Sequence, residues 1–296
     1  MFLLSLALAT PTQEAPNPYT LPIGRPGTVQ VSPGDMVDTR TGAVVDAKAV
    51  AHAATGERFV YLGELHTNPD HHRMQADVIR ALVDAGREVV VGFEMFTRPN
   101  QPNLAPWSRG YWTEEEFVEK ADWKNQWGFD FALYRPIFEV IKEYRLPMVA
   151  LNVPRDWVRS VGRGGLEALT PEQRAELPEV DLSYVEHRKV FNALMGGHPP
   201  TGTAGDNIYA AQSLWDAAMA DSALSYLDRM PPNHKTVFVV IAGSGHVMYG
   251  QGINRRVYDR TGERGVTVTA VETATPMTVA RGIGDYVFAA PPPPRA

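Results

Sequence analysis

Two glutamates and two histidines follow apolar segments of the chain: Glu64, His66, Glu94 and His246. The three apolar segments span residues 59–62, 88–91 and 236–242. Segments of this length, rich in Val, Ile and aromatic residues, suit strands that are buried on both faces. The carboxyl ends of parallel strands gather along one edge of a sheet, so we predict that the four side chains share one site there.

This set of side chains is suited to more than one kind of chemistry. Two imidazoles and two carboxylates could bind a divalent metal such as Mn²⁺, Co²⁺, Zn²⁺ or Fe²⁺ and leave positions open for water or substrate. Such a metal would lower the pKa of a bound water. Without a metal, a Glu beside a His could act as a general base. A purely structural alternative stays open, in which His66 and His246 hydrogen-bond to the carboxylates and brace the strand ends.

The segments between these residues alternate between helical and strand patterns. Asn68-Pro69 places a cap and a proline at the start of a helix that Gly86 closes, and Thr113–Glu116 has the pattern of a capping box. Residues 131–144 are a second helical candidate, and the apolar residues 147–151 predict a third strand. Strand and helix in alternation predict right-handed crossovers and a mainly parallel sheet.

From Arg155 to about Arg229 the strand patterns stop. Helices are expected to begin at Thr170 and at Asp206, the second one capped by that aspartate. Strand patterns return at residues 237–242 and 266–272. We therefore predict the α/β class, with a mainly parallel central sheet flanked by helices and a helical insertion, about residues 155–230, over the carboxyl edge of the sheet.

The two ends of the chain differ from its middle. Residues 2–9 are apolar and too short to span a bilayer, as in the core of a signal peptide, and the Pro-rich and Thr-rich residues that follow suit a linker. We predict a leader and linker over residues 1–34, a single α/β domain over 35–286 and a Pro-rich tail over 287–296. This organisation predicts a periplasmic or secreted protein with no transmembrane segment.

Composition excludes several classes of function. The 296 residues carry a formal net charge of −6, which gives no general attraction to nucleic acid. The chain has no cysteine, so disulfides, thiolate metal sites and cysteine nucleophiles are excluded. Its 44% hydrophobic and 21% charged residues are ordinary for a globular protein.

Five sequence blocks, in this order, resemble the ChaN family of haem-binding, iron-regulated proteins. The blocks are Gly63-Glu64-Leu65-His66, Gly92-Phe93-Glu94-Met95-Phe96, Asn152-Val153-Pro154-Arg155, residues 212–220 and Gly243-Ser244-Gly245-His246-Val247. The resemblance extends over about residues 59–272. ChaN proteins belong to the Tiki superfamily, which also takes in TraB-type proteins and, more distantly, erythromycin-esterase-like enzymes.

The resemblance implies haem binding linked to iron uptake at the bacterial envelope. It also implies an alternative, because Tiki-type and esterase-like members are hydrolases, some of them metal-dependent. In this chain Glu64, His66, Glu94 and His246 match the shared acid/base positions, as catalytic residues or as metal ligands. ChaN proteins are often lipoproteins, but a chain without cysteine has no lipobox. The implied protein is therefore periplasmic or secreted without a lipid anchor.

Haem needs a broad apolar slot, an axial ligand such as His or Tyr, and cationic partners for its propionates. Tyr184, Tyr209 and Tyr249 are candidate axial ligands, although each taken alone suits a packed tyrosine better than a ligand. Arg155 and Arg159 are four residues apart and would share one helix face, suited either to propionates or to solvent. A flat ligand of this size is often buried between subunits, so a homodimer is a further expectation.

Overall fold

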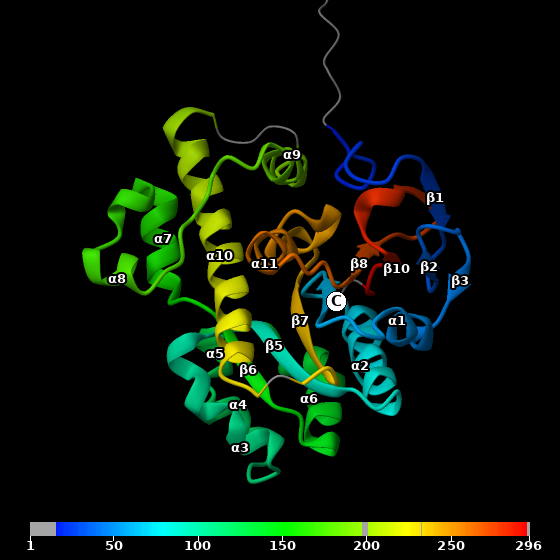
Figure 1. The fold of residues 1–296 in the computed structure, drawn as a ribbon, viewed down its shortest axis with the longest axis horizontal. Helices are drawn as coiled ribbons and strands as arrows, with labels where there is room; N and C mark the ends of the chain where they lie inside the picture. The colour runs from blue at the N-terminus through cyan, green and yellow to red at the C-terminus, as the bar shows by residue number, and fades with distance from the viewer. Residues whose placement is uncertain (1–15, 197–200, 232, 295–296) are drawn as a thin grey trace, which may run out of the picture.

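The structure, a computed structural model, describes residues 16–196, 201–231 and 233–294. An eight-stranded sheet runs through the molecule in the order β3-β2-β10-β8-β4-β7-β5-β6 (Figure 1). The strands are β2 (Met36–Asp38), β3 (Val44–Val45), β4 (Phe59–Glu64), β5 (Glu88–Thr97), β6 (Met148–Asn152), β7 (Thr236–Gly243), β8 (Val266–Glu272) and β10 (Tyr286–Ala290). Neighbours from β10 to β6 are parallel, and β2 and β3 add an antiparallel edge.

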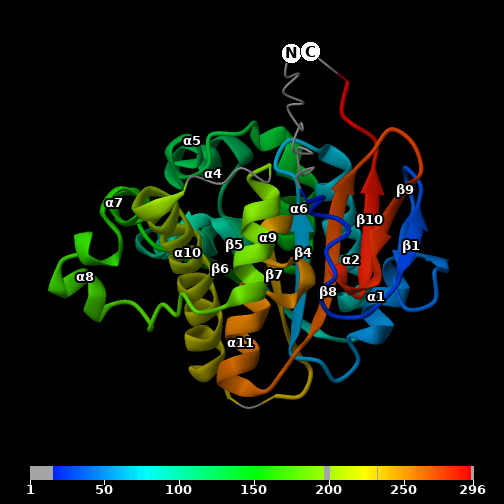
Figure 2. The same cartoon turned by 90° about the horizontal axis from the view of Figure 1, so that it is seen from above.

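A second, two-stranded sheet pairs β1 (Thr28–Val31) with β9 (Met277–Ala280) in antiparallel register. It lies beside β10 at one end of the molecule, while α7 and α8 lie at the other end (Figure 2). The central sheet is therefore the element that connects the two ends.

The central strands are apolar because both faces of the sheet are covered. In β4, Phe59 and Tyr61 pack into one hydrophobic core, and Val60 and Leu62 pack into another on the opposite face. This alternation follows from the two-residue period of a strand. One core is closed by α1 (Ala47–Ala53), α2 (Pro69–Asp84) and α6 (Phe131–Tyr144), and the other by α10 (Gly202–Asp228) and α11 (Ile253–Thr261). The fold class predicted from the sequence is confirmed.

The remaining helices are short and connect or cover these elements. They are α3 (Ala105–Ser108), α4 (Glu114–Lys120), α5 (Trp123–Gln126), α7 (Arg155–Gly164), α8 (Pro171–Ala175) and α9 (Val185–Leu194). Single 3-10 turns are η1 (Arg98–Asn103), η2 (Leu166–Ala168), η3 (Ser244–His246), η4 (Met248–Gly250) and η5 (Arg281–Ile283). The turn η3 continues directly from β7 and carries one of the predicted site histidines.

Local sequence explains where several helices begin. The Asn68 side chain accepts the backbone N–H of Asp70 at the start of α2, and Thr113 and Glu116 form the expected capping box of α4. The expectation for α10 was wrong in one respect. This helix begins at Gly202, so Asp206 lies inside it and pairs with Arg188 at 2.7 Å instead of capping it.

Within the insertion, α10 packs along one face of the sheet and α7 packs against α10. The helix α9 lies at the carboxyl edge, where Val190 and Ala193 are buried beside Met248 of η4. The sheet edge is therefore covered by α9 in particular, whereas most of the insertion packs on the face of the sheet.

Both predicted end segments contribute to the described structure. The strand β10 runs to Ala290, so the sheet includes residues that the sequence analysis assigned to the tail. Leu21, Ile23 and the strand β1 are packed in a core, although they fall in the expected linker. The apolar stretch at residues 2–9 lies outside the described residues. Within the described part of the chain, no helix is long and apolar enough to cross a membrane.

Candidate functional site

The last residue of β4, Glu64, is buried and lies at the centre of a hydrogen-bonded group. Its carboxylate accepts the hydroxyl of Tyr134 at 2.8 Å and contacts Nδ1 of His66 at 2.9 Å. The second carboxylate oxygen lies 3.2 Å from Nδ1 of His72. One carboxylate thus holds two imidazoles and a phenol at the edge of the sheet.

The charge of this group is set by His72. Its Nε2 contacts the backbone oxygen of His66, and its Nδ1 contacts Glu64 and the side-chain oxygen of Gln75, each at 3.2 Å. All three neighbours are acceptors, so both ring nitrogens donate and the ring is positively charged. Burial alone would lower the pKa of His72, but hydrogen bonding to Glu64 holds it above the ordinary value.

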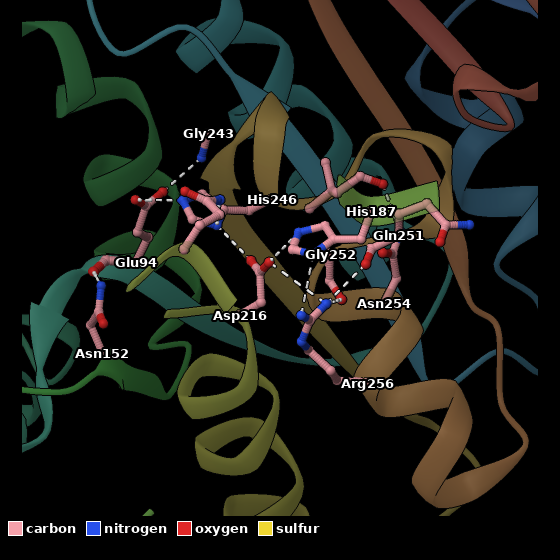
Figure 3. Close-up of polar contacts among 12 residues, drawn as sticks. Glu94, Asn152, His187, Asp216, Gly243, His246, Gln251, Gly252, Asn254 and Arg256 are labelled. Carbon is pink, nitrogen blue, oxygen red and sulfur yellow. Dashed lines mark hydrogen bonds and ion pairs between the residues drawn. The ribbon is translucent and has the colours of Figure 1, made fainter. Parts of the chain in front are cut away.

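A second acid/base group lies at the ends of β5 and β7. His246 is sandwiched between two carboxylates, with Nε2 3.3 Å from Glu94 and Nδ1 2.6 Å from Asp216 (Figure 3). The other oxygen of Glu94 accepts the backbone N–H of Gly243 at 2.7 Å. Asp216 comes from α10, so this group joins the sheet edge to the helical insertion.

From Asp216 the buried network continues into two more helices. His187 of α9 lies 2.9 Å from Asp216, and Arg256 of α11 lies 3.7 Å from it. The Arg256 guanidinium also donates to the backbone oxygens of Gln251 and Gly252 (Figure 3). Since buried charges are costly unless paired, this network fixes α9, α10 and α11 around the site.

Opposite charges hold these groups ionised at neutral pH. Burial would raise the pKa of Glu64 and Glu94, but hydrogen bonds and charges from the histidines lower both pKa values below the ordinary value. Burial would lower the pKa of His246, yet Glu94 and Asp216 raise it to about 10. The pKa of Asp216 is likewise held low, against burial, by His246 and Arg256. His246 is therefore the cationic centre of a carboxylate–imidazolium–carboxylate array.

A cavity of about 490 Å³ opens beside both groups. Glu64, His66, Gln212 and His246 line its polar side. Its apolar side is lined by Phe129, Phe191, Leu194, Met195 and Met248. A larger cavity of about 850 Å³ lies at the amino ends of β4 and β7, beside Arg58 and Thr236. In α/β sheets ligands bind at the carboxyl ends of strands, so the smaller cavity is the candidate site.

His66 is the most accessible histidine of the two groups, with a side chain that is 33% exposed. Its ring lies against Trp127 and Phe129, with ring centroids 4.6 and 5.5 Å apart. A side chain at Gly243 would meet the His66 ring at 3.0 Å, so glycine there leaves room for the imidazole. In the described part of the chain no hydrogen bond reaches Nε2 of His66, whereas its Nδ1 is held by Glu64.

The three predicted tyrosines are not among the residues that line this cavity, and their hydroxyls have other partners. The hydroxyl of Tyr184 donates to Asp259 at 2.7 Å, and that of Tyr209 lies 3.0 Å from His187. The hydroxyl of Tyr249 accepts the backbone N–H of Leu21 and donates to a backbone oxygen. A role for these tyrosines as axial ligands stays a prediction that their contacts do not favour.

The two predicted arginines lie on α7 and are exposed. The guanidinium of Arg155 is close enough to Glu94 to feel its charge, although burial and Arg159 together lower the pKa of Arg155. Neither arginine is among the residues that line the cavity. Their role toward propionates stays a prediction.

Several residues of the site carried no sequence signal. Tyr134, His187 and Arg256 lie on helices whose patterns only indicated packing. Tyr19 lines the cavity from a segment that the sequence analysis treated as linker. These four positions come from distant parts of the chain, and only the tertiary fold brings them to the sheet edge.

The expected metal ligands are arranged in pairs. Glu64 contacts His66 and His72, and Glu94 contacts His246, so each carboxylate is directed at an imidazole nitrogen. Across residues 16–196, 201–231 and 233–294, no group of three or more His, Asp or Glu side chains converges as a metal site would require.

The fold and the site together define a class of protein: an α/β protein with an apolar cavity beside acid/base residues at the carboxyl edge of its sheet. The family model described as "Haem-binding uptake, Tiki superfamily, ChaN" matches residues 50–257, and this chain belongs to that family. The resemblance seen in the five sequence blocks is therefore confirmed.

Two solved structures illustrate the likeness. The structure described as "Cofacial heme binding to ChaN of Campylobacter jejuni" has a TM-score of 0.66 and 18% identity, and the match covers 86% of this chain and 95% of that chain. An erythromycin esterase, EreC, has a TM-score of 0.48 and 14% identity, over 82% of this chain and 77% of that chain. At such identities the likeness of the Campylobacter protein concerns the fold. A comparison with curated proteins gave no significant match.

Proposed function

We propose that this protein binds haem in the cavity at the carboxyl edge of the sheet, as part of iron or haem acquisition at the bacterial envelope. The observation that carries the proposal is the cavity itself, of about 490 Å³, in a chain that belongs to a haem-binding family. Pockets for small molecules and cofactors span roughly 300–1,000 Å³ and are mostly apolar with a few polar groups. The cavity has this size and this composition.

The residues that line the cavity suit haem. Haem has a flat apolar body, which Phe129, Phe191 and Leu194 would contact, and an iron that takes an imidazole ligand. Arg155, on the exposed face of α7, is close enough to Glu94 to feel its charge, and with Arg159 it is the predicted partner of the propionates. Haem, when bound, supplies an iron centre that the cavity walls would shield from water. Because part of the wall is exposed, a second copy of the chain could complete the enclosure, and export is supported by the apolar stretch at residues 2–9.

A hemin titration with matched variants of α9 tests both parts of this proposal. Leu194 lines the cavity and is 43% exposed, so Leu194→Glu places a charge on the wall without disturbing the core. Val185 is on the same helix, 66% exposed and outside the cavity. We expect saturable absorbance changes with the wild type and with Val185→Glu. For Leu194→Glu we expect binding at least about tenfold weaker, equivalent to a loss of roughly 1.4 kcal/mol or more.

The possible results distinguish haem binding itself from its location in this cavity. A wild type that shows no saturable change would rule out haem binding. A Leu194→Glu variant that binds as tightly as Val185→Glu would rule out this cavity and leave haem binding elsewhere on the molecule.

A second candidate function is hydrolysis, favoured by the arrangement of His66. His66 lines the cavity, its Nδ1 is held by the buried Glu64, and no hydrogen bond among the described residues reaches its Nε2. This is the arrangement of a general base oriented by a carboxylate. His66 would take a proton from water while the water oxygen attacks an ester or peptide carbonyl. The imidazolium would then return that proton to the leaving alcohol or amine as the C–O or C–N bond breaks.

Hydrolysis is tested with a chromogenic ester, with and without EDTA and with Mn²⁺, Co²⁺ or Zn²⁺ added. If the protein is a hydrolase, His66→Ala should abolish turnover. Hemin should inhibit turnover, because hemin and the ester would occupy the same cavity. Turnover equal to that of buffer under all these conditions would exclude hydrolysis for this class of substrate.

A further inference from the structure

We infer that a separate cavity of about 420 Å³ binds a phosphate group, carried by a small organic phosphate or by a lipid headgroup. This cavity, the arginine cavity, is bounded by η5, the first turn of α11 and the loops that lead into β8 and β10. It shares no lining residue with the cavity proposed for haem. The inference therefore goes beyond the proposed function and does not depend on it.

The lining of the arginine cavity is rich in cations. It contains four arginines and two carboxylates, although the whole chain carries a formal net charge of −6. A concave surface lined mainly by one sign of charge concentrates counter-ions, so this cavity favours anions. The arginines are Arg25, Arg255, Arg264 and Arg281, and the carboxylates are Glu186 and Asp285.

Three of the four arginines are not neutralised by a carboxylate. Arg255 pairs with Asp259 at 3.0 Å. Within the described residues, Arg25 and Arg281 donate only to a hydroxyl or to backbone oxygens, and Arg264 lies against an aromatic ring. Arginine stays charged at every physiological pH, so these three positive charges are available to a ligand.

The two carboxylates of the lining are held by neutral donors. Asp285 accepts the backbone N–H of Thr267 at 3.0 Å, and Glu186 accepts the side-chain amide of Gln251 at 3.3 Å. Neither carboxylate forms an ion pair with a lining arginine among the described residues. The cavity therefore keeps an excess of positive charge.

The fold holds two of the arginines beside the same residue. Nη1 of Arg281 donates to the backbone oxygen of Thr39 at 2.7 Å, and Nη1 of Arg25 donates to the Thr39 hydroxyl at 3.3 Å. Gly282 allows this approach, because a Cβ there would lie 1.8 Å from the backbone oxygen of Ile23. A guanidinium has five N–H donors, and each of these two uses only Nη1 within the described residues, so donors remain for a ligand.

The other two arginines lie over one aromatic ring. The guanidinium carbons of Arg264 and Arg255 are 4.6 and 6.0 Å from the ring centroid of Tyr258, which also lines the cavity. A cation–π contact positions a guanidinium without cancelling its charge. Each side of the cavity thus has a pair of arginines that share one contact.

A phosphate suits this cavity better than a single carboxylate does. A phosphate monoester carries a charge of about −1.5 to −2 at pH 7 and has three acceptor oxygens. The planar guanidinium can bind it through two parallel hydrogen bonds. Ligand pockets span roughly 300–1,000 Å³, so about 420 Å³ leaves room for an organic group attached to the phosphate.

Calorimetric titration of the full chain with inorganic phosphate tests the inference, with succinate as the carboxylate for comparison. Arg25→Glu and Arg264→Glu each reverse one exposed charge of the lining, and Arg109→Glu makes the same change at an exposed arginine outside the cavity. We expect the wild type and Arg109→Glu to bind phosphate equally within about twofold. The two cavity variants should bind it at least about tenfold more weakly.

Vesicles distinguish the two sources of the phosphate group. Phosphatidylcholine vesicles with and without phosphatidic acid are mixed with the protein and sedimented. Sedimentation that requires phosphatidic acid, and that Arg25→Glu and Arg264→Glu reduce but Arg109→Glu does not, would identify a lipid headgroup. Binding of free phosphate without sedimentation would identify a soluble organic phosphate.

Several results would overturn the inference. They are a wild type that binds neither phosphate nor these vesicles, succinate bound as tightly as phosphate, and Arg109→Glu weakened as much as the cavity variants. Hemin titration of the same variants separates this cavity from the proposed haem site, and we expect it to be unchanged. Weaker hemin binding in Arg25→Glu and Arg264→Glu alone would make these arginines part of the haem site and would contradict a separate phosphate site.

Discussion

At the scale of single residues, the site is built from carboxylates that each orient one or two imidazoles. Glu64 serves His66 and His72, and Asp216 serves His246 and His187. The difference between the two groups is access. His246 is enclosed and paired through both nitrogens, whereas the side chain of His66 is 33% exposed and lines the cavity.

Protonation of His66 would remove the base that the hydrolysis candidate requires. The groups facing this ring are Glu64, Glu94 and the imidazolium of His246. Burial and His246 act to lower the pKa of His66, but the two carboxylates raise it above its ordinary value of 6.5. Under this candidate, turnover of the chromogenic ester is therefore expected to fall as pH falls through this raised pKa, by up to about tenfold per pH unit for a single proton. Initial rates between pH 5 and 9 measure this slope, and turnover that does not change over this range would contradict the role of His66 as the base.

Asp216 is the residue whose loss should cost most stability. Asp216→Asn would leave His246 and Arg256 as buried cations without their shared counter-charge. Removing one partner of a buried pair costs about 3–5 kcal/mol, so we expect a fall of this size in the free energy of unfolding measured with urea. Asp206→Asn is the control, because its 67% exposed carboxylate pairs with Arg188 at the surface and should cost less than about 1 kcal/mol. Equal losses in the two variants would contradict the role of the network.

The residue types and their convergence could be predicted from the sequence, but their partners could not. Glu64, His66, Glu94 and His246 stood out because each follows an apolar strand, and the structure brings them to one edge of the sheet. His187 lies on an ordinary amphipathic helix, where nothing in the local pattern distinguishes a buried ion-pair partner from a solvent-exposed histidine. Its partner Asp216 is 29 residues away in sequence and is found only by tertiary packing.

At the scale of elements, α9 is the helix that encloses the cavity. It contributes Phe191 and Leu194 to the cavity wall and is tied to α10 by the His187–Asp216 pair. The exposed apolar side chains of Val185, Leu194 and Met195 show that much of its outer surface is not packed in the single chain. The His187–Asp216 pair is the buried charged contact that joins this helix to α10.

Loss of that contact is expected to loosen α9. His187→Ala removes the imidazole that joins α9 to Asp216, so amide hydrogen exchange within residues 185–194 should become faster by at least about tenfold. Arg188→Ala is the control, since Arg188 pairs with the exposed Asp206 on the surface. Unchanged protection of α9 in His187→Ala would show that apolar packing alone holds this helix.

Elements with strong local signals were predicted well. The helices α2 and α6 follow the expected boundaries because Asn68 and Asp130 cap their first turns. The start of α10 was misplaced because its 27 residues include many small apolar side chains that are buried on a broad face, and Asp206 resembled a cap. The strands β1 and β10 gave weak signals beside Pro-rich segments, and their pairing with β9, β8 and β2 is what stabilises them.

At the scale of the whole molecule, the buried charges make stability depend on pH. The pKa of His246 is raised from 6.5 to about 10 on folding, against burial, by Glu94 and Asp216. A raised pKa contributes stability that is fully present below the ordinary pKa and is lost as pH rises through the folded value. We therefore expect the free energy of unfolding to fall between about pH 7 and pH 10.

Urea unfolding of the wild type and His246→Gln across this range measures the effect. The variant lacks the titrating ring, so its alkaline decline should be shallower. If both proteins lose stability in parallel, the decline comes from other groups and the pairing of His246 in the folded state is weaker than its contacts indicate.

The central claim is that haem occupies the cavity between the ends of β4 and β7 and the helix α9. A crystal structure of the hemin complex tests it most directly. The account predicts the porphyrin against Phe129, Phe191 and Leu194. Haem bound at another surface of the protein, with this cavity filled only by water, would contradict it.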